Sequence, residues 1–394
     1  MRFPQLRYRD QRIAVFGESG SGKTVLLSSF YGSAQEPAFL RDSPYRITAD
    51  DPGQGNRLNK NYLGMKNEAM LPEGTRFRPE TYGFSVTTAG PTDPKLAKQR
   101  SFDALRLSWF DYPGEWFEAA TSEHTEAQYK AETFENLLRS DIAFLLVDGQ
   151  RLRDHAGEET KYLKSLFHNY RTGLMALQHR LVTGAEPLDR FPRIWILALT
   201  KTDLTPDLDV YGFRDLIIEN AADDLDELRK QIAVFVGDTG ALSVGEDFLL
   251  LSSAKFEPDT IEVDRRVGVD LILPLAAILP FERHVWWASK KLLPGTIAQD
   301  LLGRADTLAH ALLGGRSRLP MIITKSMKLN KITMLLSFVK AEHIQAAIDL
   351  AGTKLQDANT RALANHDHLL ATLTGFKVAL ERAEADGVLL RSRR

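Results

Sequence analysis

Short runs of apolar residues recur along the chain, and most of them lead into a glycine-rich or polar stretch. Residues 13–16, 142–147 and 194–199 are uninterrupted apolar runs, the pattern of strands buried on both faces of a parallel sheet. Residues 82–88 and 105–110 alternate between apolar and polar positions, which predicts two strands that pair antiparallel with each other. The whole pattern predicts an α/β fold with a doubly wound sheet.

Helical spacing marks three further regions. Between residues 155 and 182, apolar residues recur every three or four positions, which predicts a long helix packed on the sheet or on another helix. The apolar stretch 271–281 is too short to span a membrane, so we expect it to be buried in a helix that closes the core near Trp287. Residues 342–383 predict either a pair of amphipathic helices or one broken helix, packed within the chain or against a partner.

The first apolar run leads into residues 17–24, whose sequence GESGSGKT has the G-x-x-x-x-G-K-[ST] spacing of a phosphate-binding P-loop. Glycines let backbone N–H groups approach phosphate oxygens, and the following helix points its N-terminus at the anion. Lys23 is expected to reach the β- and γ-phosphates, and Thr24 to place its hydroxyl on Mg²⁺. The alternative is a chance match, a glycine turn before an ordinary helix. The nucleotide-binding residues expected here are Gly17, Gly20, Ser21, Gly22, Lys23, Thr24 and Val25.

A second motif begins at Asp111, where an alternating strand runs into Asp-Tyr-Pro-Gly. This is the D-x-x-G spacing of a GTPase switch II, in which Asp111 would hold the Mg²⁺ shell and the Gly114 N–H would sense a γ-phosphate. Glu115 stands where many small GTPases place a glutamine that orients the attacking water. It is therefore either a catalytic residue that positions water or a first-turn acid that complements a helix dipole. A carboxylate near the γ-phosphate adds negative charge, so we expect slow hydrolysis.

The third and fourth motifs are typical of guanine recognition. Residues 200–203, Thr-Lys-Thr-Asp, resemble the [NT]-K-x-D motif: Asp203 would accept two hydrogen bonds from guanine, and the stem of Lys201 would lie over the base. Adenine lacks that pair of donors, so a buried carboxylate would disfavour it. Ser253 and Ala254 follow another apolar run in an S-A-K element, whose backbone N–H would contact guanine O6.

Each short motif recurs by chance, but these four stand in order and each follows an apolar strand, where a doubly wound sheet binds its ligand. The hexapeptide Asp-Tyr-Pro-Gly-Glu-Trp at 111–116, with the P-loop and the T-K-x-D element, resembles the YcjX-like family of bacterial P-loop GTPases. The chain is also similar to the divergent GTPases of bacterial conflict and defence operons. Either resemblance implies a cytoplasmic protein that binds and hydrolyses GTP, with a stress-linked role.

The long interval between the P-loop and Asp111 is expected to hold an extended switch I. Thr75 and Thr81 are the candidates to close over Mg²⁺ and the γ-phosphate, because both precede the strand at 82–88. Arg78 is either a built-in arginine finger or an ordinary surface arginine. Residues 50–56 are expected to be a cluster of turns.

Composition fits this assignment without sharpening it. The chain has 394 residues, 43% of them hydrophobic and 26% charged, with a formal net charge of −2, so charge gives no drive toward nucleic acid. It has no cysteine, which excludes disulfides and thiolate metal sites and fits a reducing compartment. The first ten residues carry no apolar signal core, and we expect a cytoplasmic protein. Basic residues at 316–331 fit a solvated face better than contact with anionic lipid or nucleic acid.

We therefore expect a P-loop GTPase domain over residues 1–287, with insertions in switch I and near 150–190, followed by a mostly helical region at 288–394. The leading hypothesis is a GTPase switch that uses GTP, GDP and Mg²⁺ and meets a protein partner through its switch loops or C-terminal helices. A nucleotide-gated scaffold with little hydrolysis and an ATP enzyme with a coincidental T-K-x-D remain alternatives.

Overall fold

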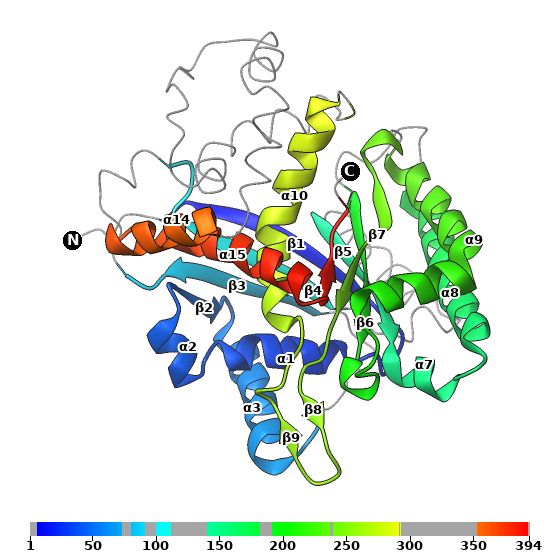
Figure 1. Cartoon of the computed structure of the whole chain (residues 1–394), viewed down its shortest axis with the longest axis horizontal. Helices are drawn as coiled ribbons and strands as arrows, with labels where there is room; N and C mark the ends of the chain where they lie inside the picture. The colour runs from blue at the N-terminus through cyan, green and yellow to red at the C-terminus, as the bar shows by residue number, and fades with distance from the viewer. Residues whose placement is uncertain are drawn as a thin grey trace.

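The computed structural model describes residues 6–72, 80–90, 100–111, 140–181, 191–236, 239–290, 292 and 353–392. In this part of the chain a mixed sheet of eight strands is flanked by helices, so the fold is α/β as predicted (Figure 1). Its central strands are parallel: β1 (Tyr8–Phe16), β4 (Ala104–Asp111), β5 (Ile142–Asp148), β6 (Ile194–Thr200) and β7 (Ser243–Leu250). Its outer strands are antiparallel to their neighbours: β2 (Tyr45–Ala49), β3 (Glu80–Thr88) and β10 (Leu389–Leu390).

The order across the sheet is β10-β7-β6-β5-β1-β4-β3-β2, and the predicted strands are confirmed within a few residues. The predicted antiparallel pair is also confirmed, as β3 and β4. β1 starts five residues before the predicted run and pairs with β4 from Tyr8 onward. Arg9 and Gln11 are buried polar residues of this extension, so hydrophobicity alone does not reveal it.

Two hydrophobic cores lie on opposite faces of the sheet because neighbouring strand residues point to opposite sides. On one face Ile13 and Val15 belong to a core that includes residues of α1 (Lys23–Ser33), α10 (Ile272–Ser289) and α15 (His368–Ala385). On the other face Ala14 and Phe16 belong to a core that includes residues of α8 (Glu159–Leu181) and α9 (Val210–Val236). Burial on both faces explains the uninterrupted apolar runs of the central strands.

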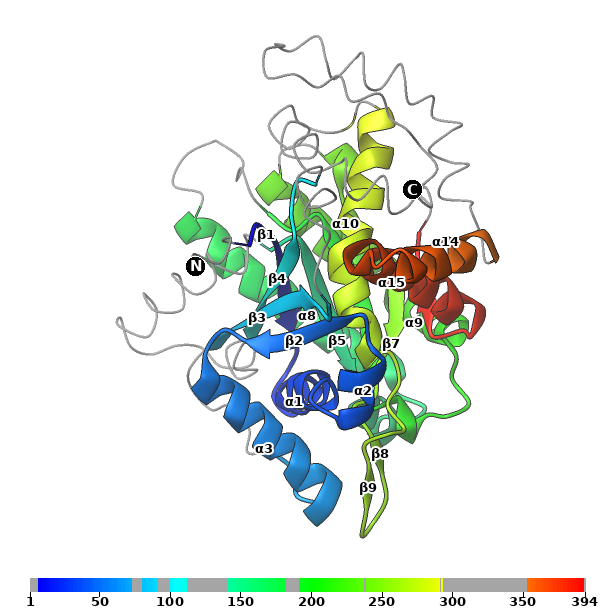
Figure 2. The ribbon, with the colours of Figure 1, turned by 90° about the vertical axis from the view of Figure 1, so that its left-hand side faces the viewer.

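The turn cluster expected at 50–56 is wrong, because this segment starts helix α3 (Pro52–Glu68). Asp51 is the N-cap: its side chain accepts a hydrogen bond from Gln54 N, and Pro52 stands in the first turn, where its missing N–H costs nothing. The turn-forming residues therefore mark a helix start. α3 lies beside α1 and buries Leu58 and Tyr62 (Figure 2).

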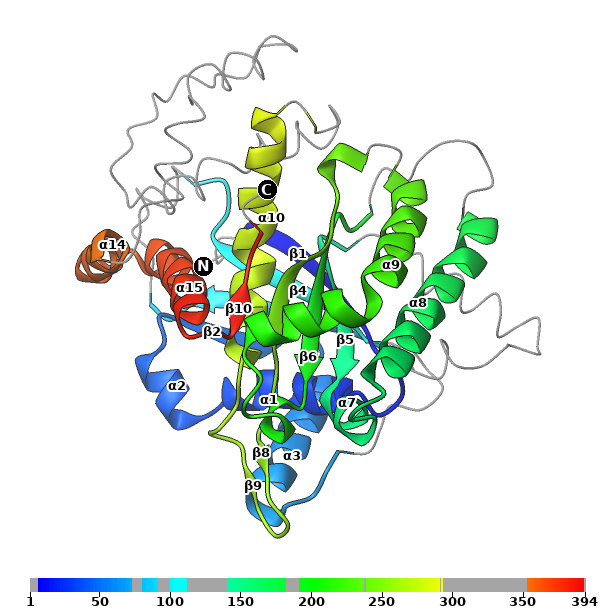
Figure 3. The same cartoon turned by 45° about the vertical axis from the view of Figure 1, so that its right-hand side comes forward.

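The helix expected between residues 155 and 182 is confirmed as α8, which begins after the short helix α7 (Gly149–Asp154). α9 was not predicted, although Phe213, Ile217 and Leu228 on its inner side are completely buried. α8 and α9 pack against each other on the same face of the sheet (Figure 3). The shorter elements are α2 (Pro37–Asp42), η1 (Thr202–Leu204), η2 (Thr239–Ala241), η3 (Val269–Leu271), β8 (Lys255–Phe256) and β9 (Ile261–Glu262).

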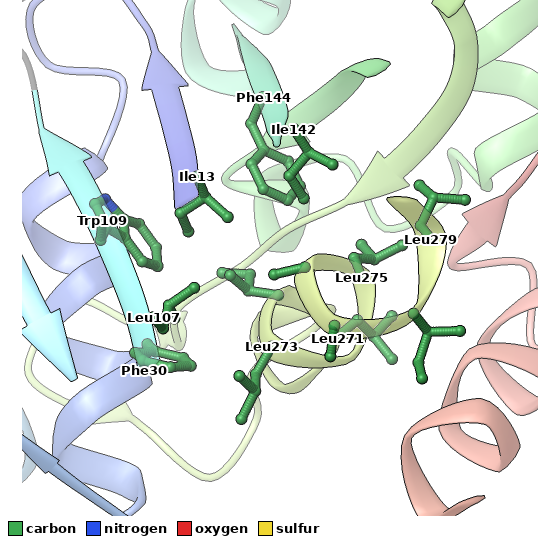
Figure 4. Close-up of a cluster of buried hydrophobic side chains, with 14 of the residues drawn as sticks. Ile13, Phe30, Leu107, Trp109, Ile142, Phe144, Leu271, Leu273, Leu275 and Leu279 are labelled. Atoms are coloured by element: carbon green, nitrogen blue, oxygen red, sulfur yellow. The ribbon is translucent and has the colours of Figure 1, made fainter. Parts of the chain in front are cut away.

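The closing helix predicted near 271–287 is confirmed as α10, and its apolar stretch is buried as expected. Leu275 and Leu279 of α10 belong to the same buried cluster as Ile13 and Phe144 of the sheet, and Figure 4 shows these side chains. Pro280 lies inside this helix without ending it. Among the helices of the described residues, none is both long and apolar enough to cross a membrane.

The described C-terminal residues form the predicted helix pair, α14 (Thr353–Ala364) and α15, and residues 342–352 of that prediction lie outside the described part. β10 then pairs with β7. Glu282 of α10 forms ion pairs with Lys377 at 3.2 Å and with Arg391 at 3.0 Å. α15 and β10 thus pack on the α/β core, and the division into domains at residue 287 stays a prediction.

Candidate nucleotide-binding site

The predicted site residues of the described part gather at one edge of the sheet. Because β1, β4, β5, β6 and β7 are parallel, their carboxyl ends meet at this edge, where α1 and α7 begin (Figure 3). The P-loop follows β1, Asp111 ends β4, Lys201 follows β6, and Ser253 lies shortly after β7. These segments are far apart in the sequence, and the fold brings their ends together.

The loop between β1 and α1 has the conformation that its glycines allow. Gly20 and Gly22 have φ angles of 80° and 89°, in the left-handed region that side chains disfavour. Gly17 is needed for space instead, since a Cβ there would lie 2.4 Å from Ser21 Oγ. The Ser21 N–H donates to the Glu18 carbonyl at 3.2 Å, which closes the turn. The loop is therefore a tight ring of backbone groups.

The Lys23 ammonium lies inside this ring. Its Nζ donates to the Gly17 carbonyl at 2.8 Å and to the Glu18 carbonyl at 3.1 Å, and the residue is only 8% exposed. Lys23 and Thr24 form the first turn of α1, which contains no acidic residue. The positive helix end and the ammonium therefore act in the same place. Val25 is half-buried and packs against a small cluster with Tyr62.

One loop residue is unexpected. Glu18 is 4% exposed and forms an ion pair with Arg151 of α7, with 2.8 Å between Oε2 and Nη1. Arg151 Nη2 also donates to the Ser19 carbonyl at 3.1 Å, and Asn169 Nδ2 of α8 donates to Glu18 Oε1 at 3.3 Å. The sequence offered no signal for Arg151 or Asn169, because neither belongs to a nucleotide-binding motif.

The expected metal side of the site is described in part. Asp111 is the last residue of β4, is 2% exposed, and lies opposite Val15 of β1 in the strand register. Its carboxylate therefore belongs to the strand next to the P-loop strand. The other predicted residues of this side, Thr75, Gly114 and Glu115, lie outside the described residues, and so does Arg78.

Thr81 lies in a different setting from the one predicted. β3 begins at Glu80, so Thr81 is inside the strand rather than in a loop before it. It lies opposite Phe110, whereas Glu80 lies opposite Asp111, and neighbouring residues point to opposite faces. The Thr81 side chain therefore lies on the face of the sheet opposite to that of Asp111.

A polar cluster adjoins Asp111 on its own face. Glu80 interacts with both Arg57 of α3 and the Tyr82 hydroxyl, and Arg57 Nη2 donates to the Tyr82 oxygen at 3.0 Å. Burial, and then the hydrogen bond with Glu80, raises the pKa of Tyr82 well above its ordinary value. This phenol therefore stays protonated and donates to Glu80.

The base end begins with Lys201, whose φ of 55° is uncommon for a residue with a side chain. Lys201 Nζ lies 2.8 Å from Oδ2 of Asp148, the buried last residue of β5. The other oxygen of Asp148 caps α7 by accepting from Gln150 N at 2.9 Å. Asp148, which belongs to none of the four motifs, therefore fixes the direction of the Lys201 side chain.

Asp203 is oriented by the loop after β7. The Ser252 hydroxyl lies 2.7 Å from Asp203 Oδ1, and Phe256 N donates to Oδ2 at 3.4 Å. Ser253 and Ala254, the predicted O6 contacts, lie in that same loop and are buried. The Ser29 hydroxyl of α1 donates to the Ser253 carbonyl at 2.8 Å. This bond joins the loop after β7 to the helix that follows the P-loop. Ser252 was missed, although it starts the same serine-rich segment.

The comparisons with known proteins are distant. No family model and no curated protein matches the chain, so the YcjX-like resemblance is carried by the short motifs alone. Among solved structures, the chain is similar to the signal recognition particle receptor SRb-GTP/SRX complex from Chaetomium thermophilum, with 17% identity and a TM-score of 0.32 over 65% of this chain and 94% of that one. A likeness of this degree carries no argument about what this chain binds.

Proposed function

We propose that this protein binds GTP and GDP together with Mg²⁺ at this edge of the sheet and hydrolyses GTP slowly as a conformational switch. The observation that carries the proposal is the joint arrangement of the P-loop ammonium of Lys23 with the oriented carboxylate of Asp203. The two ends are linked through Ser29 and the Ser253 carbonyl, 2.8 Å apart. A nucleotide would lie across both ends, with its phosphates in the P-loop and its base at Asp203.

Guanine specificity would come from Asp203. A carboxylate has about four acceptor positions, and Ser252 and Phe256 N address one oxygen each. Capacity remains for the guanine N1–H and its exocyclic amine. Adenine offers no matching pair of donors at these positions, so it would leave the carboxylate poorly satisfied. The Lys201 stem, held by Asp148, would lie over the base.

Mg²⁺ fits the donors on the phosphate side. Thr24 offers a hydroxyl and Asp111 a carboxylate, the hard oxygen ligands that Mg²⁺ prefers, and β1 and β4 are neighbouring strands. Thr75 would add a switch I hydroxyl. When bound, the ion would neutralise charge on the β- and γ-phosphates. Lys23 would bind the same oxygens, the Gly114 N–H would sense the γ-phosphate, and Glu115 would position water.

The substitution Asp203→Asn tests base recognition. An asparagine keeps one acceptor oxygen but presents an N–H group where guanine also has a donor. GTP affinity should therefore fall by roughly hundredfold, from one lost hydrogen bond and one pair of donors that face each other. Xanthosine triphosphate carries a carbonyl at the position of that amine, so its affinity for the variant should rise. Calorimetry with GTP, ATP and xanthosine triphosphate measures both changes. Unchanged GTP affinity in the variant would exclude Asp203 from base recognition.

Hydrolysis is tested separately by single-turnover rates with GTP and Mg²⁺. If Glu115 positions water, Glu115→Gln and Glu115→Ala should both lower the rate by at least about tenfold while GTP affinity is unchanged. Unchanged rates in both variants would leave Glu115 as the first-turn acid of a helix.

A nucleotide-gated scaffold is the second candidate, and one observation favours it. β10, near the C-terminus, pairs with β7, and β7 leads into the loop that orients Asp203. The Leu250 N–H of β7 also donates to the Val388 carbonyl at 2.9 Å. Nucleotide binding could therefore reach the C-terminal helices through a short path. Tight GTP binding without measurable turnover would select the scaffold over the switch.

A further inference from the structure

The P-loop of this protein contains a buried acid, which is an unfavourable neighbour for an anion. Glu18 follows the first glycine of the loop and is only 4% exposed. Phosphates bound in the loop carry several negative charges. An uncompensated carboxylate beneath them would repel the nucleotide, and burial would strengthen that repulsion because the local dielectric is low.

The compensating charge comes from outside the loop. The Arg151 guanidinium lies 2.8 Å from Glu18 Oε2, and its second terminal nitrogen donates to the Ser19 carbonyl at 3.1 Å. Arg151 thus contacts the carboxylate of Glu18 and the backbone carbonyl of the next loop residue, Ser19. Asn169 of α8 adds a neutral donor to the other oxygen of Glu18. α7 and α8 therefore each contribute one side chain that contacts the loop.

We propose that Arg151 is a positioning residue for nucleotide binding: it offsets the charge of Glu18 and fixes the Ser19 carbonyl, so that the loop can accept a polyphosphate. This inference rests on the proposed function, in which the loop holds the phosphates of a guanine nucleotide. The residue acts through Glu18 and Ser19 rather than by touching the substrate. Its effect is therefore largely electrostatic and depends mainly on the presence of Glu18.

Two consequences separate this role from ordinary packing. The penalty for losing Arg151 grows with the charge of the ligand, so it is largest for GTP, smaller for GDP and absent for guanosine. The penalty also shrinks when Glu18 is made neutral, because only the contact with the Ser19 carbonyl is then lost. If Arg151 merely supported the fold, its loss would weaken the binding of all three ligands alike, and neutralising Glu18 would not restore that binding.

The experiment measures GTP, GDP and guanosine affinities by calorimetry for the wild type, Arg151→Ala, Glu18→Gln and the double variant. Arg151→Ala should weaken GTP by at least about tenfold and GDP by about threefold, with guanosine unchanged. Adding Glu18→Gln should restore GTP affinity to within about threefold of the wild type. Arg151→Lys, which keeps the charge, should lose less than Arg151→Ala.

Arg153→Ala is the matched control, since Arg153 is an exposed arginine of the same short helix and contacts Gln150 rather than the loop. Thermal unfolding checks that each variant is folded. Wild-type affinity in Arg151→Ala would overturn the inference while leaving the proposed function intact. A loss that Glu18→Gln does not rescue would also overturn it, because Arg151 would then not act through the charge of Glu18. Failure of the wild type to bind GTP would instead contradict the proposed function.

Discussion

The phosphate end and the base end of the candidate site are built in different ways. The phosphate end comes from one continuous segment, in which the Lys23 ammonium lies 2.8 Å from the carbonyl of Gly17. The base end comes from two loops, after β6 and after β7, that meet where Ser252 lies 2.7 Å from Asp203. The first end is assembled by local chain geometry and the second by the topology of the sheet.

The acids Glu18, at the phosphate end, and Asp203, at the base end, have different partners. Glu18 at the phosphate end is paired with the cation of Arg151, whereas Ser252 and Phe256 N, which hold Asp203, are neutral donors. Neutral donors orient a carboxylate without cancelling its charge. Asp203 thus keeps its negative charge as an acceptor for guanine. The charge of Glu18 is offset by Arg151, so it repels phosphate less. Substitutions should therefore have different ligand profiles at the two ends.

The largest effect is expected from Lys23→Ala at the phosphate end. Losing the ammonium inside the loop should weaken GTP and GDP by roughly hundredfold, because a charged contact to phosphate is removed. The residual binding should still prefer guanine over adenine, since Asp203 is untouched. Calorimetry with GTP, GDP and ATP measures this, and circular dichroism checks the fold. Lys161→Ala is the control, at a lysine whose side chain is 78% exposed; native GTP affinity in Lys23→Ala would contradict the account.

Switch I offers the next largest effect. Thr75→Val should lower Mg²⁺-dependent GTP hydrolysis by at least about tenfold, because it removes an expected metal and phosphate contact. Thr81→Val should leave the rate unchanged, since Thr81 is an exposed residue inside β3 on the face away from Asp111. Single-turnover rates with and without Mg²⁺ distinguish the two. A loss confined to Thr81→Val would reverse this assignment.

A smaller effect is expected from Ser252→Ala at the base end. Removing one hydrogen bond to Asp203 costs about 1 kcal/mol, which should reduce the preference for GTP over ATP by about fivefold. Ser253→Ala should change little, because Ser253 is expected to act through its backbone. Competition binding with a fluorescent GTP analogue measures both variants. Equal losses in the two would remove the special position of Ser252.

The smallest effect is expected from Ser29→Ala, which cuts the link between the two ends. The buried Ser29 hydroxyl donates to the Ser253 carbonyl, and its loss should lower the free energy of unfolding by about 1 kcal/mol. GTP affinity should fall by about threefold or less, with the GTP-to-ATP preference nearly unchanged. Urea unfolding and calorimetry measure the two effects. A strong loss of guanine preference would mean that the two ends are not separable.

Much of the sheet could be predicted from the sequence because its central strands are buried on both faces. The uninterrupted run at 194–199 has the short length and the continuous apolar character of such a strand, and it became β6. α3 was missed because Asp51 and Pro52 are found both in turns and at helix starts, and only the apolar side beyond them separates the two. β10 has two residues and owes its existence to pairing with β7, which no local pattern reveals.

In the candidate site, too, some residues could be predicted from a local pattern and others could not. Gly17 to Thr24 could be recognised because a phosphate loop is one local segment with fixed spacing. Arg151, Asn169 and Asp148 could not, since each contributes a single polar side chain from a helix or strand end that the motif does not include. Their roles depend on which elements the sheet order makes neighbours, and this order emerges only from the complete fold.

The most direct test of guanine nucleotide binding at this edge is the affinity of the wild-type protein for GTP and for ATP, measured by calorimetry under the same conditions with Mg²⁺. Two hydrogen bonds from guanine to Asp203 should make GTP bind at least about hundredfold more tightly than ATP. Equal affinity for the two nucleotides would contradict the account and return the P-loop to the wider class of ATP-binding proteins.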